Sequence, residues 1–158
     1  MIIRAIEPRD NKTVAQIIVE TLAEYGAKGD GFASADPELK NMFAAYQLTN
    51  AAYFVIEDEG RILGCGGIGP LKNGDSATCE LQKMYFRTEL RGRGWGKKLI
   101  AHCLRLAKSY GYSKCYIETL PNMVAAQAVY KLAGFDYIPE RMGNTGHSKC
   151  HVFMLKNL

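Results

Sequence analysis

Glycine and basic residues alternate in one short segment, Arg91–Lys97, which reads RGRGWGK. Glycine allows a positive φ, so successive backbone N–H groups in such a segment can converge on one anion. The segment precedes a predicted helix, whose N-terminus adds partial positive charge, and Arg91, Arg93 and Lys97 add charged donors. We therefore predict that it binds a pyrophosphate, although a tight strand-to-helix connection would use the same glycines.

The glycine spacing and the charge distribution narrow the ligand class. The P-loop pattern G-x-x-x-x-G-K-[ST] is absent, and no strand with a distant acid frames a dinucleotide fingerprint. The chain has a net charge of +4, yet six basic residues and one acid lie between Lys83 and Lys98. A single basic segment favours a compact anionic small molecule over nucleic acid. Surface aromatics interleaved with basic residues, as RNA binding requires, are also missing.

The strand expected before this segment, Ala77–Phe86, has a slip in its apolar alternation. Apolar residues fall at positions 79 and 81 and then at 84 and 86, so the alternation shifts by one at Gln82–Lys83. A β-bulge inserts one such extra residue. We predict a bulge that frees backbone N–H groups for a ligand; the alternative is a regular strand with Lys83 at its edge.

Apolar periodicity predicts alternating strands and helices along the whole chain. The expected strands are Ile2–Ile6, Tyr53–Glu57, Arg61–Ile68, Ala77–Phe86, Lys114–Thr119, Phe135–Ile138 and His151–Leu155. The expected helices are Thr13–Leu22, Pro37–Tyr46, Gly94–Tyr110 and Asn122–Ala133. This order predicts one α/β domain over residues 1–158, with a mixed sheet and helices on both faces.

Composition sets the broad class of the protein. The chain has 158 residues, of which 47% are apolar and 23% charged, an ordinary globular mixture. No apolar run approaches the roughly 20 residues of a membrane helix, and the N-terminus lacks a secretory signal, so we expect a cytoplasmic protein. The five cysteines form no C-x-x-C pair and are expected to be buried free thiols. His147 and His151 lack the ligand spacing of a metal site.

Two motifs resemble those of the GCN5-related N-acetyltransferases, the GNAT family. The acetyl-CoA motif (Q/R)-x-x-G-x-(G/A) matches Arg91, Gly94 and Gly96. Residues 125–135, AAQAVYKLAGF, are similar to the family's second conserved helix with its tyrosine and terminal Gly-Phe. The resemblance implies a GNAT-like, mostly antiparallel sheet that splays between the Glu80 strand and the Tyr116 strand to admit the cofactor.

The resemblance implies acetyl-CoA as the cosubstrate. Backbone N–H groups of the glycine-rich segment would hold its pyrophosphate, and the preceding strand would pair with its pantetheine arm. The N–H of Met84 would polarise the thioester carbonyl, whose oxygen gains charge during acyl transfer. The expected cofactor-binding residues are Met84, Tyr85, Phe86, Arg91, Gly92, Arg93, Gly94, Trp95, Gly96, Lys97 and Asn122.

Asn122 marks a departure from the family pattern. The family commonly has an asparagine seven residues before the tyrosine, and this chain has Met123 there. Either Asn122 reaches the pantetheine from its shifted position, or the contact is absent and Asn122 caps the helix.

Acetyl transfer to an amine requires two proton transfers. A lysine-like amine, with a pKa of about 10.4, must lose a proton, and the leaving thiolate must gain one. Glu80 is the expected base, acting through water, and Glu118 is the alternative. Tyr130, four residues before Gly134 as the family motif requires, is the expected acid. The structural alternatives are an exposed or ion-paired Glu80 and a Tyr130 that only packs in the core.

The acceptor is expected to be a primary amine on a small molecule, an amino acid, a peptide or a protein. By the resemblance, its site uses residues 24–46 and 141–151. The aromatic candidates, which either line this pocket or belong to the core, are Tyr25, Phe32 and Tyr46. The polar candidates are interpreted as solvated loop residues, and the alternative is that they bind a carboxylate or close the site: Arg141, Asn144 and His147.

His102 is expected on the exposed side of its helix, with no role. The main alternative function is a catalytically weak acetyl-CoA-binding regulatory module. A homodimer, common in the family, is compatible with the sequence.

Overall fold

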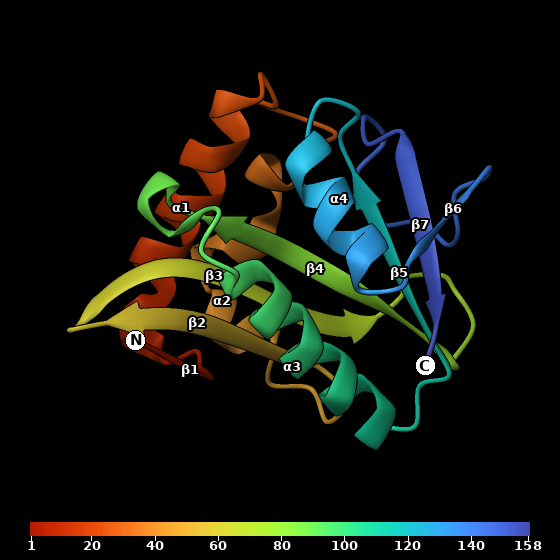
Figure 1. The fold of residues 1–158 in the computed structure, drawn as a ribbon, viewed down its shortest axis with the longest axis horizontal. Coiled ribbons are helices and arrows are strands. Elements are labelled where there is room, and N and C mark those ends of the chain that lie inside the picture. The colour runs from red at the N-terminus through yellow and green to blue at the C-terminus, as the bar shows by residue number, and fades with distance from the viewer.

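One seven-stranded sheet organises the chain in a computed structural model that describes all residues 1–158 (Figure 1). The strands are β1 (Ile2–Ala5), β2 (Ala52–Asp58), β3 (Arg61–Pro70), β4 (Thr78–Phe86), β5 (Lys114–Thr119), β6 (Asp136–Ile138) and β7 (Val152–Asn157). They lie in the order β1-β2-β3-β4-β5-β7-β6, and only β4 and β5 pair in parallel. The mixed, mostly antiparallel sheet predicted above is confirmed.

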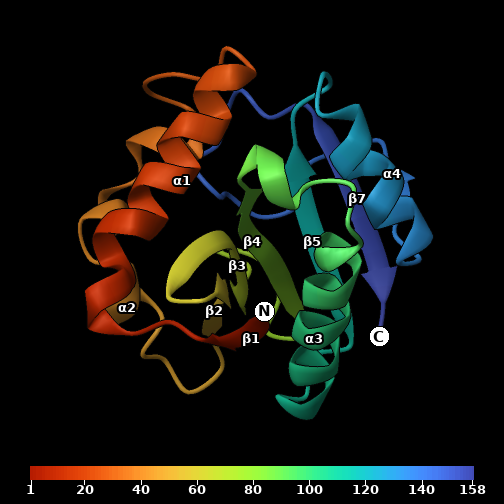
Figure 2. The same cartoon turned by 60° about the vertical axis from the view of Figure 1, so that its left-hand side comes forward.

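Helices cover both faces of the sheet, as predicted. The helices are α1 (Asn11–Glu24), α2 (Met42–Ala45), α3 (Trp95–Ser109) and α4 (Val124–Leu132). Short 3-10 segments occupy Pro8–Asp10, Ala33–Ala35, Pro37–Lys40 and Thr88–Leu90. Figure 2 shows α1 and α2 on one side of the sheet and α3 and α4 on the other.

Each face of the sheet has its own apolar core because the long helices are amphipathic. On α1, Val14, Ile17 and Ile18 are spaced to face the sheet and are fully buried. On α3, Leu99 and Ile100 do the same on the opposite face. Burying one such side chain stabilises the fold by about 1.5–3 kcal/mol, so these stripes fix how both helices lie on the sheet.

The expected helix Pro37–Tyr46 is wrong as a continuous element. The chain forms a 3-10 turn over Pro37–Lys40, breaks at Asn41 and then makes the single turn of α2. Asn41 has an extended φ of −155°, and its side chain accepts a hydrogen bond from the Ala44 N–H at 3.1 Å. An asparagine side chain that bonds the backbone in this way starts a helix rather than continuing one.

The expectation for His102 is also wrong. Its ring is only partly exposed and meets the Phe54 ring edge-on, with centroids 4.5 Å apart. Burial lowers the pKa of His102. The side chain therefore packs over β2 instead of facing solvent.

The sheet splays where the cofactor entry was predicted. Strands β4 and β5 pair over three positions, ending at Glu80 opposite Tyr116. Beyond that pair both strands continue apart, β4 to Phe86 and β5 to Thr119. The fork places Glu80 at its vertex.

All five cysteines are free, and four of them are buried; Cys150 is partly exposed. No helix combines the length and the apolar character needed to cross a membrane.

Candidate active site

The predicted bulge is present in β4. Tyr85 pairs with Cys65 and Gln82 pairs with Gly67, so two β4 residues lie opposite one β3 residue. One of the two, Lys83, has a φ of +48°, a conformation that costs a non-glycine residue about 1–2 kcal/mol. The bulge therefore needs support from neighbouring strands.

Tyr53 of β2 supplies that support. Its hydroxyl donates to the Lys83 carbonyl at 2.6 Å. The ring can lie across β3 because residue 67 is glycine: a Cβ there would come within 2.5 Å of the Tyr53 ring. Gly67 and Tyr53 together hold the bulge, which sets the direction of every β4 side chain beyond it.

The glycine-rich segment forms an open cradle at the start of α3. Gly92 and Gly94 have φ values of +72° and +78°, and a Cβ on either would meet no protein atom within 4 Å. The N–H groups of residues 92–97 make no backbone hydrogen bonds. Unpaired, converging donors at a helix N-terminus fit the pyrophosphate of acetyl-CoA.

A cavity of about 360 Å³ runs from this cradle into the fork of the sheet. Nine of the residues expected to bind the cofactor line it: Met84, Tyr85, Phe86, Arg91, Gly92, Gly94, Trp95, Gly96 and Lys97. Arg93 and Asn122 are not among its lining residues. The other walls come from Thr21 of α1, from Tyr25 directly after this helix, and from the inner face of α4. We call this cavity the cofactor cleft.

The side chain of Arg91 is hydrogen-bonded to other groups of the protein. Its two terminal nitrogens donate to the Glu24 carboxylate at 2.6 and 3.0 Å, and its Nε donates to the Phe86 carbonyl at 2.8 Å. The ion pair lowers the pKa of Glu24. Arg91 therefore braces the loop between β4 and α3 against the end of α1, and the exposed basic residue that lines the cleft is Lys97.

Glu80 is a buried carboxyl, only 5% exposed, at the vertex of the fork. Burial raises its pKa above the ordinary value, which suits a base that works near neutral pH. Gln82 donates from Nε2 to Glu80 Oε2 at 2.8 Å, and the Tyr46 hydroxyl donates to Gln82 Oε1 at 2.8 Å. The carboxyl is thus oriented by two side chains, and the interpretations as an exposed or ion-paired residue are wrong.

Glu118 on β5 has a different environment. Its Oε1 accepts from the Tyr116 hydroxyl at 2.8 Å and its Oε2 accepts from the Thr145 hydroxyl at 2.9 Å. Arg141 Nε lies 3.1 Å from Oε1. Because both oxygens are occupied by protein groups, this carboxylate ties β5 to the loop between β6 and β7.

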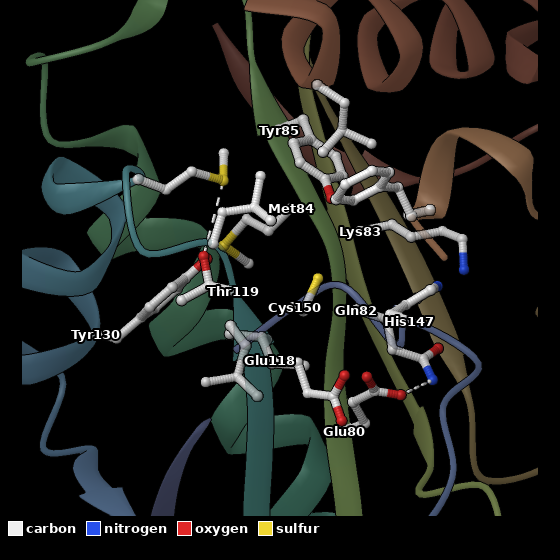
Figure 3. Close-up of a pocket in the computed structure, with 17 residues that line it drawn as sticks. Glu80, Gln82, Lys83, Met84, Tyr85, Glu118, Thr119, Tyr130, His147 and Cys150 are labelled. Atoms are coloured by element: carbon white, nitrogen blue, oxygen red, sulfur yellow. Dashed lines mark hydrogen bonds between the residues drawn. The ribbon is translucent and has the colours of Figure 1, made fainter. Parts of the chain in front are cut away.

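Tyr130 of α4 points into the fork (Figure 3). It is 5% exposed, and its ring contacts Phe135 with centroids 6.2 Å apart. No protein group hydrogen-bonds to its hydroxyl, and burial raises its pKa. The phenol therefore remains protonated at neutral pH with its proton free for a ligand.

A second, smaller cavity of about 40 Å³ lies beyond the fork, on the side of α1 and the loop before β7. We call it the acceptor chamber. Its polar walls are Glu80, Gln82, Lys83, Glu118, Thr119 and His147, and Cys150 also lines it. Met84, Tyr85, Met123 and Tyr130 line both this chamber and the cofactor cleft. The two cavities therefore meet at one shared wall, and Figure 3 labels Met84, Tyr85 and Tyr130 of this wall.

Comparison with known proteins identifies the family. The model of the Acetyltransferase (GNAT) family matches residues 14–135. The chain belongs to the GNAT family. It is 40% identical over 158 residues to YjgM, an uncharacterized N-acetyltransferase of Escherichia coli (strain K12), with 99% of this chain and 95% of that protein covered. The GNAT family consists of acyltransferases that use acetyl-CoA.

Solved structures share this fold. An acetyltransferase of the GNAT family from Staphylococcus aureus matches with a TM-score of 0.87 at 21% identity, covering 99% of this chain and 98% of that one. The structure of yncA from Salmonella typhimurium with its cofactor acetyl-CoA matches with a TM-score of 0.78 at 20% identity, covering 100% and 94%.

Asn122 does not cap the second GNAT helix. Its side chain donates to the Tyr25 carbonyl at 3.1 Å, and Met123 occupies the N-cap position without a capping side chain. The link joins the end of α1 to the start of α4 across the mouth of the cofactor cleft. A direct contact between Asn122 and the pantetheine stays a prediction.

The three aromatic residues that were expected near the acceptor lie in different parts of the site. Phe32 lines the acceptor chamber, whereas Tyr25 lines the cofactor cleft. Tyr46 is buried against Tyr53, with ring centroids 4.7 Å apart, and reaches the site only through Gln82.

The interpretation of Arg141 and His147 as solvated loop residues is wrong. Besides its contact with Glu118, Arg141 donates to the carbonyls of His147 and Cys150 at 3.0 and 2.7 Å. His147 Nε2 lies 2.9 and 3.1 Å from the two oxygens of Asp36. Asn144 alone is exposed as expected, and its side chain accepts only from the Gly146 N–H.

Sequence reasoning missed Gln82 and Asp36. Gln82 carried a signal, because its position two residues after Glu80 puts both side chains on one face of a strand. Asp36 carried none, since its partners Lys83 and His147 come from distant parts of the chain.

Proposed function

We propose that this chain transfers the acetyl group of acetyl-CoA to a primary amine by direct attack. The shared wall of the two cavities supports this proposal most strongly. A thioester bound in the cofactor cleft would reach the wall at Met84 and Tyr130, and an amine in the acceptor chamber would reach it from the other side. The geometry needs no covalent enzyme intermediate, and burial raises the pKa of Cys150 to about 12, which disfavours the thiolate that a covalent route would use.

The cofactor would be held mainly by backbone groups. Acetyl-CoA supplies an acetyl group already activated as a thioester. The N–H groups of residues 92–97 would bind its pyrophosphate, and Lys97 would add charge. The Met84–Phe86 backbone would pair with the pantetheine, and the Met84 N–H would donate to the thioester oxygen. The guanidinium of Arg91 would stay paired with Glu24 and would not contact the pyrophosphate directly.

Two side chains would carry out the two proton transfers. Glu80 would accept the proton of the attacking amine, directly or through one water, as the new N–C bond forms. Tyr130 would donate its proton to the sulfur as the C–S bond breaks, so that free CoA leaves as a thiol. The phenolate then regains a proton from solvent. Glu118, whose oxygens are already occupied, would serve a structural role.

The test is a screen of primary amines and amino acids that measures the release of CoA thiol from acetyl-CoA. The proposal expects at least one amine to accelerate release and to appear in its acetylated form by mass spectrometry. Tight acetyl-CoA binding by calorimetry with no accelerated release by any amine would instead favour a regulatory module.

A further inference from the structure

The acceptor chamber is covered by two loops that are joined by one carboxylate. Asp36 lies in the loop between α1 and α2, and its Oδ2 contacts Lys83 Nζ at 2.7 Å. The same carboxylate contacts Nε2 of His147, from the loop between β6 and β7, at 2.9 Å. We call Asp36, Lys83 and His147 the clip.

Two further contacts join the same loops. The Lys149 N–H donates to the Gly31 carbonyl at 3.3 Å, and the Lys149 ammonium lies 5.1 Å from the centre of the Phe32 ring. The loop between α1 and α2 contains only short 3-10 turns, and the loop between β6 and β7 contains no helix or strand. These contacts and the clip therefore join the two loops to each other, whereas Glu118 ties the second loop to β5.

The clip is a shielded ion pair rather than a surface one. Its side chains are 17% exposed for Asp36, 8% for Lys83 and 13% for His147. Burial alone would raise the pKa of Asp36, but His147 and Lys83 lower it overall, so the carboxylate stays charged and paired. Water weakens such a contact far less than it weakens an exposed pair.

Two of the three clip residues also form part of the chamber wall. Lys83 and His147 line the chamber together with Glu80. The space inside the chamber is about 40 Å³, whereas about 10–15 Å³ of such space is enough for one water molecule. The chamber can therefore hold an amino group and a few attached atoms.

We propose that the acceptor is a small free amine, and that the clip sets its upper size limit. Peptide and protein amines are excluded because Asp36 holds the two loops together over Glu80. This inference rests on the proposed acetyl transfer, and it names the class of acceptor. Opening the clip should admit larger amines to the same chamber.

The first test compares acceptor sizes in the wild type and two clip variants. Asp36→Asn removes the negative charge that contacts both Lys83 and His147. His147→Ala removes only the contact with His147 and leaves the Asp36–Lys83 pair. Asp136→Asn is the matched control, because it breaks the exposed Lys131–Asp136 pair, neither residue of which lines the chamber. The probes are methylamine, ethanolamine, glycine, free lysine and a ten-residue peptide with a free N-terminus and one lysine.

We expect the wild type and the control to prefer their best small amine over the peptide by about 100-fold or more in kcat/KM. Each clip variant should narrow that ratio by about tenfold or more. A wild type that acetylates the peptide as well as any small amine would overturn the inference while supporting the proposed function.

The second test does not depend on turnover. Cys150 lines the chamber, and its raised pKa makes it slow to react. Iodoacetamide should alkylate Cys150 about tenfold or more faster in Asp36→Asn and His147→Ala than in the wild type. Mass spectrometry locates the modified cysteine, and circular dichroism verifies that each variant is folded.

The two tests separate the two claims. Faster alkylation of Cys150 in the variants, with no amine acetylated by any protein, would support the clip and overturn the proposed function. Amine acetylation with unchanged alkylation of Cys150 would support the proposed function and overturn the clip. If Asp36→Asn does not fold, the acceptor preference and the Cys150 alkylation rate of His147→Ala decide both tests.

Discussion

The two cavities of this protein are built by different means. The cofactor cleft is long and open, about 360 Å³, and its anion site consists of backbone N–H groups from one short segment. The acceptor chamber is about 40 Å³ and is bounded by side chains from separate elements, which interlock through hydrogen bonds and ion pairs. A backbone site can be kept while surface residues change, whereas a side-chain chamber changes its ligand with single substitutions. One fold can thus keep one cosubstrate and vary the acceptor.

The largest expected effect comes from blocking the backbone site. Gly94→Val should weaken acetyl-CoA binding by about 100-fold or more, because valine disfavours the φ of +78° and its side chain would occupy the cradle. Calorimetry measures the affinity. Gly111→Val is the matched control: Gly111 has a φ of +88° and open space around it, but it lies at the far end of α3. Equal losses of affinity in both variants would show that strain, not the cradle, matters.

The next effect concerns the wall that the cavities share. Tyr130→Phe should lower kcat by about 10- to 100-fold with little change in acetyl-CoA affinity, since it keeps the ring and removes the proton. Stopped-flow measurement of the chemical step with one identified amine tests this. Tyr112→Phe, which removes a buried hydroxyl bonded to the Asn50 carbonyl outside the site, should leave the step unchanged. A wild-type rate in Tyr130→Phe would make Tyr130 a core residue.

A stability effect should distinguish the two carboxyls of the chamber. Glu118→Gln should lower the free energy of unfolding by about 2 kcal/mol, because it weakens a charged group's contacts with Tyr116, Thr145 and Arg141. Urea denaturation measures the change. Glu80→Gln should not destabilise the protein at neutral pH, since burial disfavours the ionised carboxylate and glutamine removes its charge while keeping its shape. The reverse order of stabilities would mean that the structural and functional roles are exchanged.

The smallest expected effect tests the brace beside the cradle. Glu24→Gln should tighten acetyl-CoA binding about two- to fivefold, because it removes a negative charge near the pyrophosphate site and frees Arg91. Calorimetry at low and high salt should show the gain shrinking as salt screens the charges. A loss of affinity would mean that fixing the loop outweighs the freed charge of Arg91.

Sequence reasoning was most accurate for contiguous features. The glycine cradle and the bulge are each encoded by neighbouring residues, so their spacing predicts their geometry, whereas the fork between β4 and β5 was implied by the family resemblance. The helix predicted over Pro37–Tyr46 failed because apolar spacing does not show that the Asn41 side chain bonds the backbone. Local periodicity therefore predicted elements well, except where one side chain competes for backbone hydrogen bonds.

The side-chain contacts around the two cavities could not be predicted in the same way. Asp36 and His147 are 111 residues apart, and Arg91 and Glu24 are 67 residues apart. A single sequence gives the charge of such residues but not their partners, because ion pairs have no periodic signature. The roles of Arg91 and His147 therefore emerged only from the structure.

The pH dependence of Glu80→Gln tests the central claim, that a buried carboxyl activates the amine at the shared wall. The measurement is kcat/KM for one identified amine from pH 6 to 10 in the wild type, Glu80→Gln and Glu118→Gln. Because burial raises the pKa of Glu80, wild-type activity should fall as pH drops through that raised value. Glu80→Gln should lose about 100-fold near pH 7 and progressively less toward the amine pKa of about 10, where the amine arrives neutral. Glu118→Gln should keep the wild-type profile. A loss in Glu80→Gln that is the same at every pH would contradict the account and make Glu80 a positioning residue.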